Sequence, residues 1–220
     1  MKLQIFLVIF VILCSAGNAQ DEGFDRNIRI GAYASAGMNQ PIRLIRKYVT
    51  EDVGPFHGEE SWSAGLKFSG MISQNMRIEF AAGYSVHKAG FELSPPVYPE
   101  SKIYPETIRT YNLPVTLYRY LTRNFFIRAG TIIDFELDRR SYWIDSQNGI
   151  GFTAGAGTEL HAGNFFIDIA PNLELHSLIP FNEVMYQQRL LVFELKLGLG
   201  YCFRERIKKE SNGTLSTTNF

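Results

Sequence analysis

The chain has 220 residues, with 22 basic and 22 acidic side chains, so no net charge creates a field that would attract nucleic acid. Its 19 glycines and its aromatic content of 14% are typical of a protein rich in β-structure. The sequence holds no apolar run of the roughly 20 residues that a transmembrane helix needs, which excludes a helical membrane protein.

The amino terminus has the layout of a secretory signal peptide. An apolar run over residues 5–13 is followed by Gly17 and Ala19, which form a small-x-small cleavage site. We expect cleavage after Ala19. Residues 1–19 are then the signal peptide, and residues 20–26 form a short polar leader in the periplasm.

Two cysteines bear on export. Cys14 follows Leu13 instead of the small residue that normally precedes a lipid-attachment cysteine, which disfavours a lipoprotein. After cleavage Cys202 is the only cysteine, so no internal disulfide can form. We expect this thiol to be sheltered.

Eight segments of the mature chain alternate apolar and polar residues with a period of two, which predicts strands with unlike faces. We expect these strands at residues 28–38, 61–73, 76–87, 108–121, 125–138, 149–162, 165–178 and 190–203. Short turns and long loops alternate between them; the long loops are expected at residues 39–60, 91–106, 139–148 and 179–188. Pro114 interrupts the fourth strand and requires a bulge or a weak position in the hydrogen-bond ladder.

The last strand shows this pattern most clearly. From Leu191 to Phe203 every second residue is apolar, whereas the residues between them are charged or small. A helix is excluded, because its period would spread both sets around the whole surface. At roughly 3.3 Å per residue the strand can cross the ~25 Å apolar band of an outer-membrane barrel. The polar residues 204–220 beyond it predict a disordered tail.

An even number of strands, with short turns on one side and long loops on the other, is the layout of a barrel. We predict an all-β, eight-stranded antiparallel up-and-down transmembrane β-barrel over residues 27–203. Lipid demands such a closed sheet, because an open edge would leave backbone groups unpaired. The predicted location is the cell outer membrane of a Gram-negative bacterium, with both termini periplasmic and outer-membrane lipid as a partner.

Aromatic residues gather near both ends of the predicted strands and are expected to form two interfacial girdles. The set near the short turns is Tyr118, Tyr120, Phe125, Phe126, Phe165, Phe166, Tyr201 and Phe203. The set near the long loops is Trp62, Tyr111, Trp143 and Tyr186.

The end of the last strand resembles the carboxy-terminal assembly signal of bacterial outer-membrane β-barrels, which is a polar residue, a glycine and two aromatic residues at fixed spacing. The matching residues are Lys196, Gly198, Tyr201 and Phe203. This resemblance implies recognition by the barrel-assembly machinery.

Three other segments are similar to the small outer-membrane β-barrels of OmpA or OmpX size, and especially to the PorT-like barrel domain of Gram-negative bacteria. They are residues 111–118 (Tyr-Asn-Leu-Pro-Val-Thr-Leu-Tyr), residues 126–130 (Phe-Ile-Arg-Ala-Gly) and residues 163–166 (Gly-Asn-Phe-Phe). The resemblance covers most of the mature chain. It implies the barrel fold and, through the PorT-like proteins, a secretion-associated role.

The polar face of the strands would line the lumen, where six charged residues lie near the short turns. They are Arg29, Arg77, Glu79, Arg128, Glu159 and Asp168. Because an eight-stranded barrel has room inside for side chains only, we expect these charges to pair into a structural network that plugs the lumen. A two-residue turn places Glu159 opposite Asp168. One interpretation is that these two carboxylates form an acid/base pair. The favoured interpretation is that both carboxylates share Arg128 or Arg29 as their partner.

The histidines do not indicate a metal site. His161 and His176 lie at opposite ends of their hairpin, and His57 and His87 have no neighbouring ligand spacing. We expect no metal, no cofactor and no catalytic residue.

The first long loop carries three basic residues beside apolar ones, namely Arg43, Arg46 and Lys47. They are candidate contacts for lipopolysaccharide phosphates or a protein partner. A solvated loop face is the simpler interpretation.

Three functions are compatible with this pattern. The favoured one is a non-enzymatic outer-membrane barrel that is structural or binds a partner through its long loops or tail, as a secretion component of the PorT-like kind would. The second is a lipid-modifying enzyme on the same barrel, which needs a histidine clustered with serine or glutamate at the membrane rim. The third is a soluble lipocalin-like binder, which predicts an apolar interior and a charged exterior.

Overall fold

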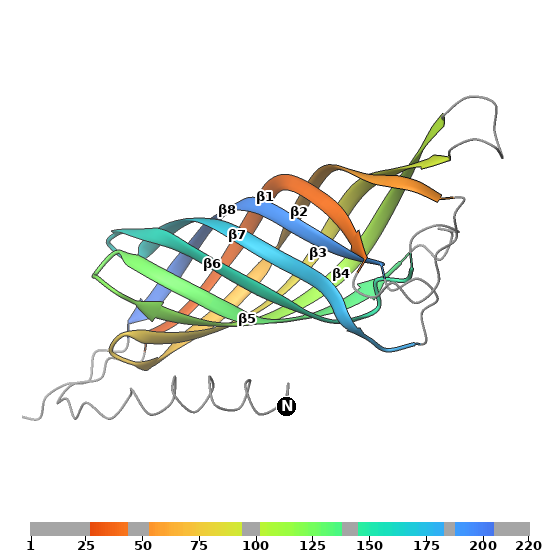
Figure 1. The fold of residues 1–220 in the computed structure, drawn as a ribbon. Helices are drawn as coiled ribbons and strands as arrows, with labels where there is room; N and C mark the ends of the chain where they lie inside the picture. Colours follow the sequence, from red (N-terminus) through yellow and green to blue (C-terminus); the bar gives the residue numbers. More distant parts are fainter. Residues whose placement is uncertain (1–26, 44–52, 94–101, 138–144, 183–187, 205–220) are drawn as a thin grey trace, which may run out of the picture.

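The computed structural model describes residues 27–43, 53–93, 102–137, 145–182 and 188–204, which form a closed barrel of eight antiparallel strands (Figure 1). In chain order the strands are β1 (Asn27–Arg43), β2 (Val53–Ser73), β3 (Met76–Leu93), β4 (Lys102–Tyr120), β5 (Phe125–Glu136), β6 (Gly149–Ala162), β7 (Phe165–Pro180) and β8 (Gln188–Arg204). Each strand pairs with the next, and β8 pairs with β1 to close the sheet. The predicted eight-stranded up-and-down barrel is therefore confirmed.

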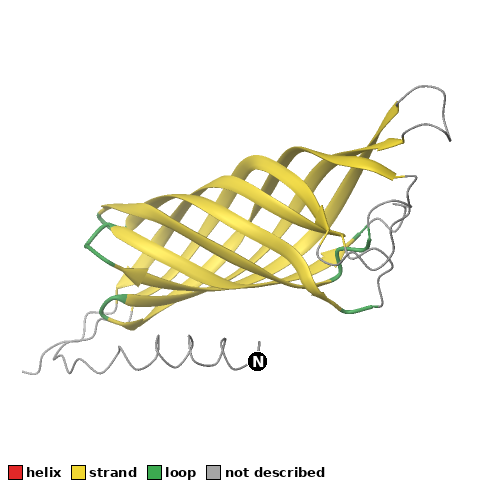
Figure 2. Cartoon of the chain, viewed as in Figure 1, coloured by secondary structure: helices red, strands yellow, loops and turns green. Residues whose placement is uncertain are grey.

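Strands make up nearly all of the described chain (Figure 2). Within the described ranges we find no helix long and apolar enough to cross a membrane. The predicted signal peptide, leader and tail lie outside the described residues. The first and last described residues, Asn27 and Arg204, are paired with each other at the end of the barrel that carries the short turns.

Two predicted long loops are shorter than expected, because the strands beside them continue. β1 and β2 extend into residues 39–60, and β3 and β4 extend into residues 91–106. Register shifts between Val53 and Phe56 and between Gly58 and Ser61 interrupt the two-residue period of β2. An interrupted period hides a strand from pattern analysis, since residues after a bulge change face.

The lengthened strands form a projection on the loop side. The β1–β2 register ends at Met38 and Glu60, and the β4–β5 register ends at Thr110 and Glu136. Beyond those points β2, β3 and β4 continue to pair with one another and rise past the rest of the barrel (Figure 1). We call this three-stranded projection the arm; it consists of residues 53–59, 88–93 and 102–109.

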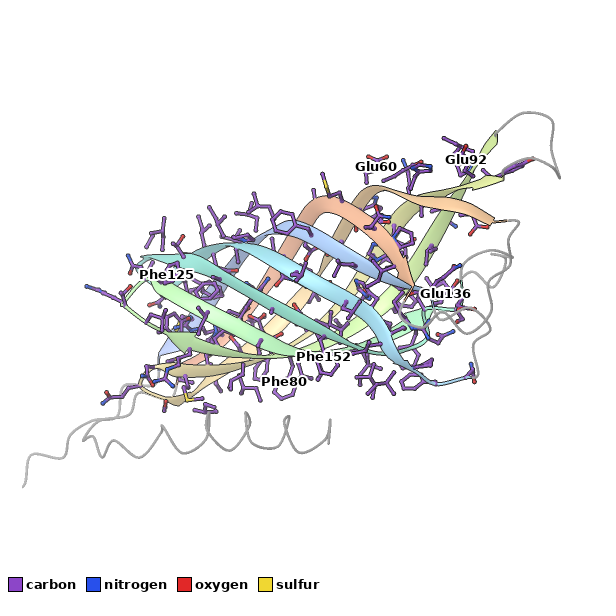
Figure 3. All side chains as sticks on the ribbon, in the orientation of Figure 1. Glu60, Phe80, Glu92, Phe125, Glu136 and Phe152 are labelled. Carbon is purple, nitrogen blue, oxygen red and sulfur yellow. The ribbon has the colours of Figure 1, made fainter. Side chains whose placement is uncertain are left out.

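Apolar side chains cover the outside of the barrel, and polar side chains fill the inside. Leu66 is 69% exposed on the outer face, whereas Arg77 and Glu159 are 0% exposed inside. Phe80 and Phe125 project away from the barrel wall (Figure 3). A soluble barrel has the reverse arrangement, so the lipocalin-like alternative is wrong. A closed sheet with an apolar exterior and a polar lumen is the architecture of a transmembrane β-barrel.

Pro114 occupies a weak position in the ladder, as predicted. The paired residues of β3 and β4 pass from Phe80 with Val115 to Gly83 with Asn112, so Pro114 falls within a gap of two pairs. The register is the same on both sides of the gap, which shows that no bulge is needed. Proline lacks the N–H that the ladder would use there.

The turn-side girdle is only partly right. Phe125, Phe165 and Phe203 are exposed on the outer face, but Tyr118, Phe126 and Phe166 are 0–2% exposed inside the lumen. Consecutive strand residues point to opposite faces, so each Phe-Phe pair supplies one ring to lipid and one to the interior. On the loop side Trp62 and Tyr111 are exposed on the outer face. The predicted positions Trp143 and Tyr186 lie outside the described residues.

Candidate functional site

The lumen is the most highly organised polar region of the described chain. Near the short turns it holds a group of residues that we call the turn-side cluster: Arg29, Lys67, Arg77, Glu79, Tyr118, Tyr120, Arg128, Glu159, His161 and Asp168. All ten residues lie at lumen-facing positions of their strands; nine are buried or partly buried, and His161 lies at the exposed end of β6.

Glu159 is the centre of the turn-side cluster. Its Oε1 lies 2.6 Å from Arg29 Nη1, and its Oε2 lies 2.5 Å from Arg77 Nη1. Tyr120 donates a hydrogen bond of 3.0 Å to Oε2, and His161 Nε2 lies 2.7 Å from Oε1. Four strands, β1, β3, β4 and β6, are thus joined across the lumen through one carboxylate.

Glu79 joins a second part of the turn-side cluster. It accepts a hydrogen bond of 2.7 Å from the hydroxyl of Tyr118, which itself accepts one of 3.0 Å from Arg128. The guanidinium of Arg77 lies 4.0 Å above the ring of Tyr118 and 4.0 Å from Glu79. The tyrosine thereby contacts both guanidinium groups and one carboxylate while being fully buried itself.

The structure places Glu159 opposite Asp168 in the β6–β7 register. The two carboxylates do not share a cation, however, because Asp168 is paired with Lys67 of β2. The expectation that both share Arg128 or Arg29 is therefore wrong: Glu159 binds Arg29, and Arg128 binds Tyr118. Lys67 was missing from the predicted set, although the alternation of β2 puts it on the polar face.

A middle layer lies above the turn-side cluster and is built around Lys196. Its Nζ lies 3.1 Å from Glu174 and 3.2 Å from Glu194, and 4.7 Å from the ring centre of Tyr33. Glu194 also accepts a hydrogen bond of 2.5 Å from Ser35. Between this layer and the turn-side cluster lies a cavity of about 10 Å³, which is at the lower limit for a single water molecule.

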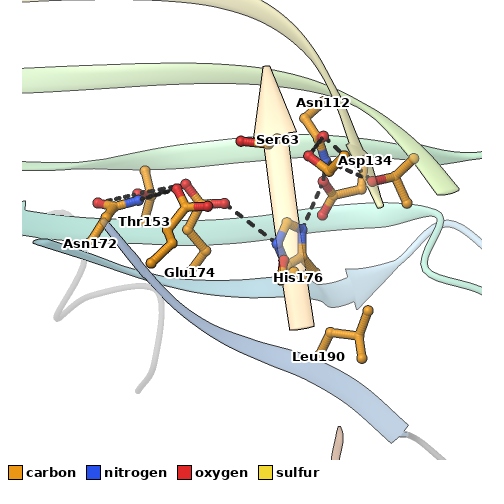
Figure 4. Close-up of polar contacts among 12 residues, drawn as sticks. Ser63, Asn112, Asp134, Thr153, Asn172, Glu174, His176 and Leu190 are labelled. Atoms are coloured by element: carbon orange, nitrogen blue, oxygen red, sulfur yellow. Dashed lines mark hydrogen bonds and ion pairs between the residues drawn. The ribbon is translucent and has the colours of Figure 1, made fainter. Parts of the chain in front are cut away.

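The loop-side half of the lumen contains two histidines that the sequence did not place together. The rings of His87 and His176 are 5.0 Å apart. Ser61 Oγ lies 2.7 Å from His87 Nδ1, and His176 Nδ1 lies 3.1 Å from Asp134 Oδ1 (Figure 4). Among the described residues, no group of three or more histidine, cysteine or carboxylate side chains is arranged to hold a metal.

A bulge in β7 completes this histidine region. The β6–β7 register shifts between Ile150 and Phe152, and Ser177 opposite this shift has a φ of 48°. Both His176 and Ser177 are therefore buried inside, where the backbone N–H of Ser177 donates a hydrogen bond of 3.2 Å to Asp134. A strict two-residue period would have put Ser177 on the lipid side, which is why the sequence did not reveal this site.

An apolar cap covers the histidine region on the loop side. It consists of four buried residues that pack together, Ala89 and Ile108 at the base of the arm and Leu190 and Val192 of β8. Leu190 and Val192 lie near the start of β8, on its lumen-facing side. From the turns to the loops, the lumen is thus filled by ion pairs, by the hydrogen-bonded histidine region and by aliphatic side chains.

The residues of the predicted assembly signal lie on both faces of β8. Lys196 and Gly198 face the lumen, and Tyr201 and Phe203 lie at the turn-side end with their rings 4.9 Å apart. A Cβ atom at Gly198 would meet Lys67 Nζ and the carboxylate of Asp168. Gly198 therefore leaves the space that the Lys67–Asp168 ion pair occupies, and this structural role is separate from its predicted role in the assembly signal.

The predicted loop contact can be located only in part. Arg43 is the last residue of β1, where its backbone pairs with Gln188 of β8. Arg46 and Lys47 lie outside the described residues.

No protein-family model matches the chain, and no curated protein sequence matches it. Solved structures with a similar fold include the outer-membrane protein AlkL, at 12% identity and a TM-score of 0.49 over 86% of this chain and 95% of AlkL. OprG from Pseudomonas aeruginosa is 13% identical with a TM-score of 0.46, over 82% of this chain and 96% of OprG. Ail of Yersinia pestis, solved with the heparin analogue sucrose octasulfate, is 13% identical with a TM-score of 0.41, over 82% of this chain and 100% of Ail. At this level of similarity these proteins carry no conclusion about activity.

Proposed function

We propose that the chain is a non-enzymatic outer-membrane barrel with a closed lumen, and that it acts through surfaces outside that lumen. The observation that carries this proposal is the continuous filling of the interior, from Glu159 near the turns to Leu190 near the loops. Eight strands enclose a space that side chains can fill completely. A solute path would have to break buried ion pairs, which is energetically costly.

Outer-membrane lipid and the barrel-assembly machinery are the partners that this proposal requires. The exposed leucines of β8, including Leu195, Leu197 and Leu199, have 52–57% of their surface available to lipid. The turn side, where Asn27 and Arg204 meet, would face the periplasm with both termini, because outer-membrane barrels carry their short turns there.

The arm is the surface that we propose for partner binding. It carries charged side chains of both signs, among them Glu60 at its base, paired with Lys88, and His57, whose Nε2 lies 3.5 Å from Glu92. Asn39 of β1 holds its base by donating hydrogen bonds to the carbonyls of Glu59, Glu60 and Lys88. A rigid base of this kind would present the arm in a fixed direction. A secretion-associated role of the PorT-like kind is one form that such binding would take.

A variant with a shortened arm tests this function. Ala89 pairs with Glu106, so replacing residues 90–105 with Asn-Gly closes the β3–β4 hairpin at that pair with a two-residue turn and keeps Ala89 and Ile108 of the apolar cap. We expect wild-type protein crosslinked in outer membranes to retain a specific partner that the variant loses, while both barrels remain folded in a heat-modifiability assay. Equal recovery of the same partners by both proteins would contradict a binding role for the arm.

The lipid-modifying alternative requires a histidine beside a serine or glutamate, which the structure contains, and a position at the membrane rim, which that pair does not have. Ser61 and His87 lie within hydrogen-bond distance, but both are 2% exposed and face the lumen beneath the apolar cap. Membrane lipid would have no access to them from the barrel exterior. Turnover in a lipid-deacylation assay, abolished by Ser61→Ala, would favour the enzyme instead.

A further inference from the structure

A single charged side chain lies on the lipid-facing side of the barrel wall. The exposed rings of Trp62 and Tyr111 mark the loop-side limit of this wall. From their level to the short turns, the described strands carry one charged residue at an outward position, which is Arg119 of β4. The other outward positions in this band hold apolar or uncharged residues. Arg119 is therefore the exception that the lipid-facing surface has to accommodate.

Apolar side chains surround Arg119. In the register it pairs with Met76 of β3 and with Ile127 of β5. Leu117 precedes it and Leu121 follows it by two residues on the same face of the hairpin. Leu121 is 54% exposed and Ile127 is 41% exposed. Because Leu121 lies nearer the turn than Arg119 does, the arginine side chain begins within the apolar surface and not beyond it.

The described part of the chain offers Arg119 no counter-ion. No described residue forms an ion pair or a hydrogen bond with its side chain. The carboxylates of the turn-side cluster, Glu79, Glu159 and Asp168, are at most 7% exposed and are paired inside the lumen. An arginine on a lipid-facing surface is accommodated when its stem lies along apolar groups and its guanidinium reaches the headgroups, where phosphate oxygens accept its N–H groups.

The adjoining turn supplies a second cation. Arg123 is exposed in the turn between β4 and β5. The backbone N–H of Leu121 donates a hydrogen bond of 2.9 Å to the carbonyl of Phe125, and Thr122 Oγ1 accepts one of 3.1 Å from the N–H of Phe125. These bonds fix the turn, and the ring of Phe125 projects outward beside it (Figure 3). The hairpin thus presents two positive charges next to an aromatic ring of the turn-side girdle.

From this arrangement we infer that the β4–β5 hairpin binds an anionic phospholipid of the periplasmic leaflet, with its phosphate at Arg119 and Arg123. An acyl chain would lie along Leu117 and Ile127, which are outward residues of the same hairpin. The inference rests on the proposed membrane insertion with the turns on the periplasmic side. It adds a site that discriminates among lipids, which the proposed function does not require.

Fluorescence quenching by brominated lipids tests this site. Phe125→Trp places a reporter on the hairpin, in a chain that carries Trp62→Phe and Trp143→Phe and so lacks its two native tryptophans. The protein is placed in vesicles of phosphatidylcholine that contain a small fraction of brominated phosphatidylglycerol or, for comparison, brominated phosphatidylcholine. We expect the anionic lipid to quench the reporter with an apparent affinity about fivefold higher or more, which is the effect of each basic side chain near the membrane surface.

Substitutions in the reporter chain separate the two cations. Arg119→Gln should lower the preference for phosphatidylglycerol about fivefold, whereas Arg119→Lys keeps the charge and should keep the preference. Arg123→Gln should lower it less, because an exposed charge in the turn is screened by water. Lys88→Gln removes a positive charge at the loop-side end of the outer face and is the matched control, which should leave the preference unchanged.

The same preference in Arg119→Gln as in the reporter chain, or equal quenching by both lipids in folded protein, would overturn the inference and leave the proposed function intact. The wild-type chain reports insertion separately through Trp62, which is exposed on the outer face. Absence of quenching of the wild-type chain by either lipid would contradict the proposed function itself.

Discussion

The two halves of the lumen are filled in different ways. The turn-side half contains four cations and three carboxylates joined by short contacts, such as Arg29 with Glu159 and Lys67 with Asp168. The loop-side half relies on Asp134, two histidines and neutral donors, and ends in aliphatic side chains. In the turn-side cluster each carboxylate lies within 4.0 Å of a cation. Near the loops the lumen is instead filled by the packing of the apolar cap. Loss of one side chain should therefore be more damaging on the turn side.

The largest effect is expected for Glu159→Ala. This change leaves the guanidinium groups of Arg29 and Arg77 buried without their carboxylate, at a cost of about 3–5 kcal/mol in the free energy of unfolding. Urea unfolding in lipid vesicles measures it. Leu160→Ala, at the neighbouring lipid-facing position, is the control and should cost far less. Equal destabilisation by both variants would show that Glu159 is not the centre of the cluster.

Substitutions at both Lys67 and Asp168 test whether this buried ion pair behaves as one unit. Lys67→Met alone leaves Asp168 buried and unpaired, and we expect a loss of about 3 kcal/mol. Adding Asp168→Leu removes the second charge and should recover most of that loss, because a buried pair can be replaced by apolar groups of similar volume. If the double variant is as unstable as the sum of the single ones, the pair is not an isolated unit.

Gly198→Ala tests the space that this ion pair requires. The added methyl group meets Lys67 Nζ and the Asp168 carboxylate, and we expect a cost of about 1–3 kcal/mol. Gly70→Ala is the control, since nothing lies within 4 Å of the atom it adds. In the background of Lys67→Met with Asp168→Leu the cost should fall. A defect in membrane assembly that persists in that background would point to the assembly signal instead.

The smallest effect is expected on the loop side. Asp134→Asn keeps the size of the side chain but weakens the acceptor for His176, Ser177 and Asn112, at a cost of about 1–2 kcal/mol. Urea unfolding of this variant beside Glu159→Ala compares the two halves directly. A larger loss for Asp134→Asn would reverse the order that we expect.

Much of this fold could be predicted from alternation alone. The period of two identified all eight strands and put Arg77, Glu159 and Lys67 on the polar face, and the two-residue turn set Glu159 opposite Asp168. Partners across the lumen could not be predicted, because they depend on how the barrel is staggered when it closes. Lys67 and Asp168 are 101 residues apart and lie on strands that are not neighbours.

Local irregularities account for the other differences. The bulge at Ser177 and the register shifts near Gly58 change which face a residue occupies, and neither leaves a regular pattern in the sequence. Position along the strand predicts that both rings of each Phe-Phe pair lie in the girdle. Consecutive residues of a strand point to opposite faces, however, so only one ring of each pair faces lipid. Phe126 and Phe166 therefore belong to the interior.

Planar-bilayer recording tests the closed lumen most directly. For the folded wild-type barrel, the ion pairs of the turn-side cluster and the apolar cap predict no stable single-channel conductance at neutral pH. Large and stable conductance steps from the folded wild-type barrel would contradict the account, because ions would then pass through an interior that the structure shows to be filled.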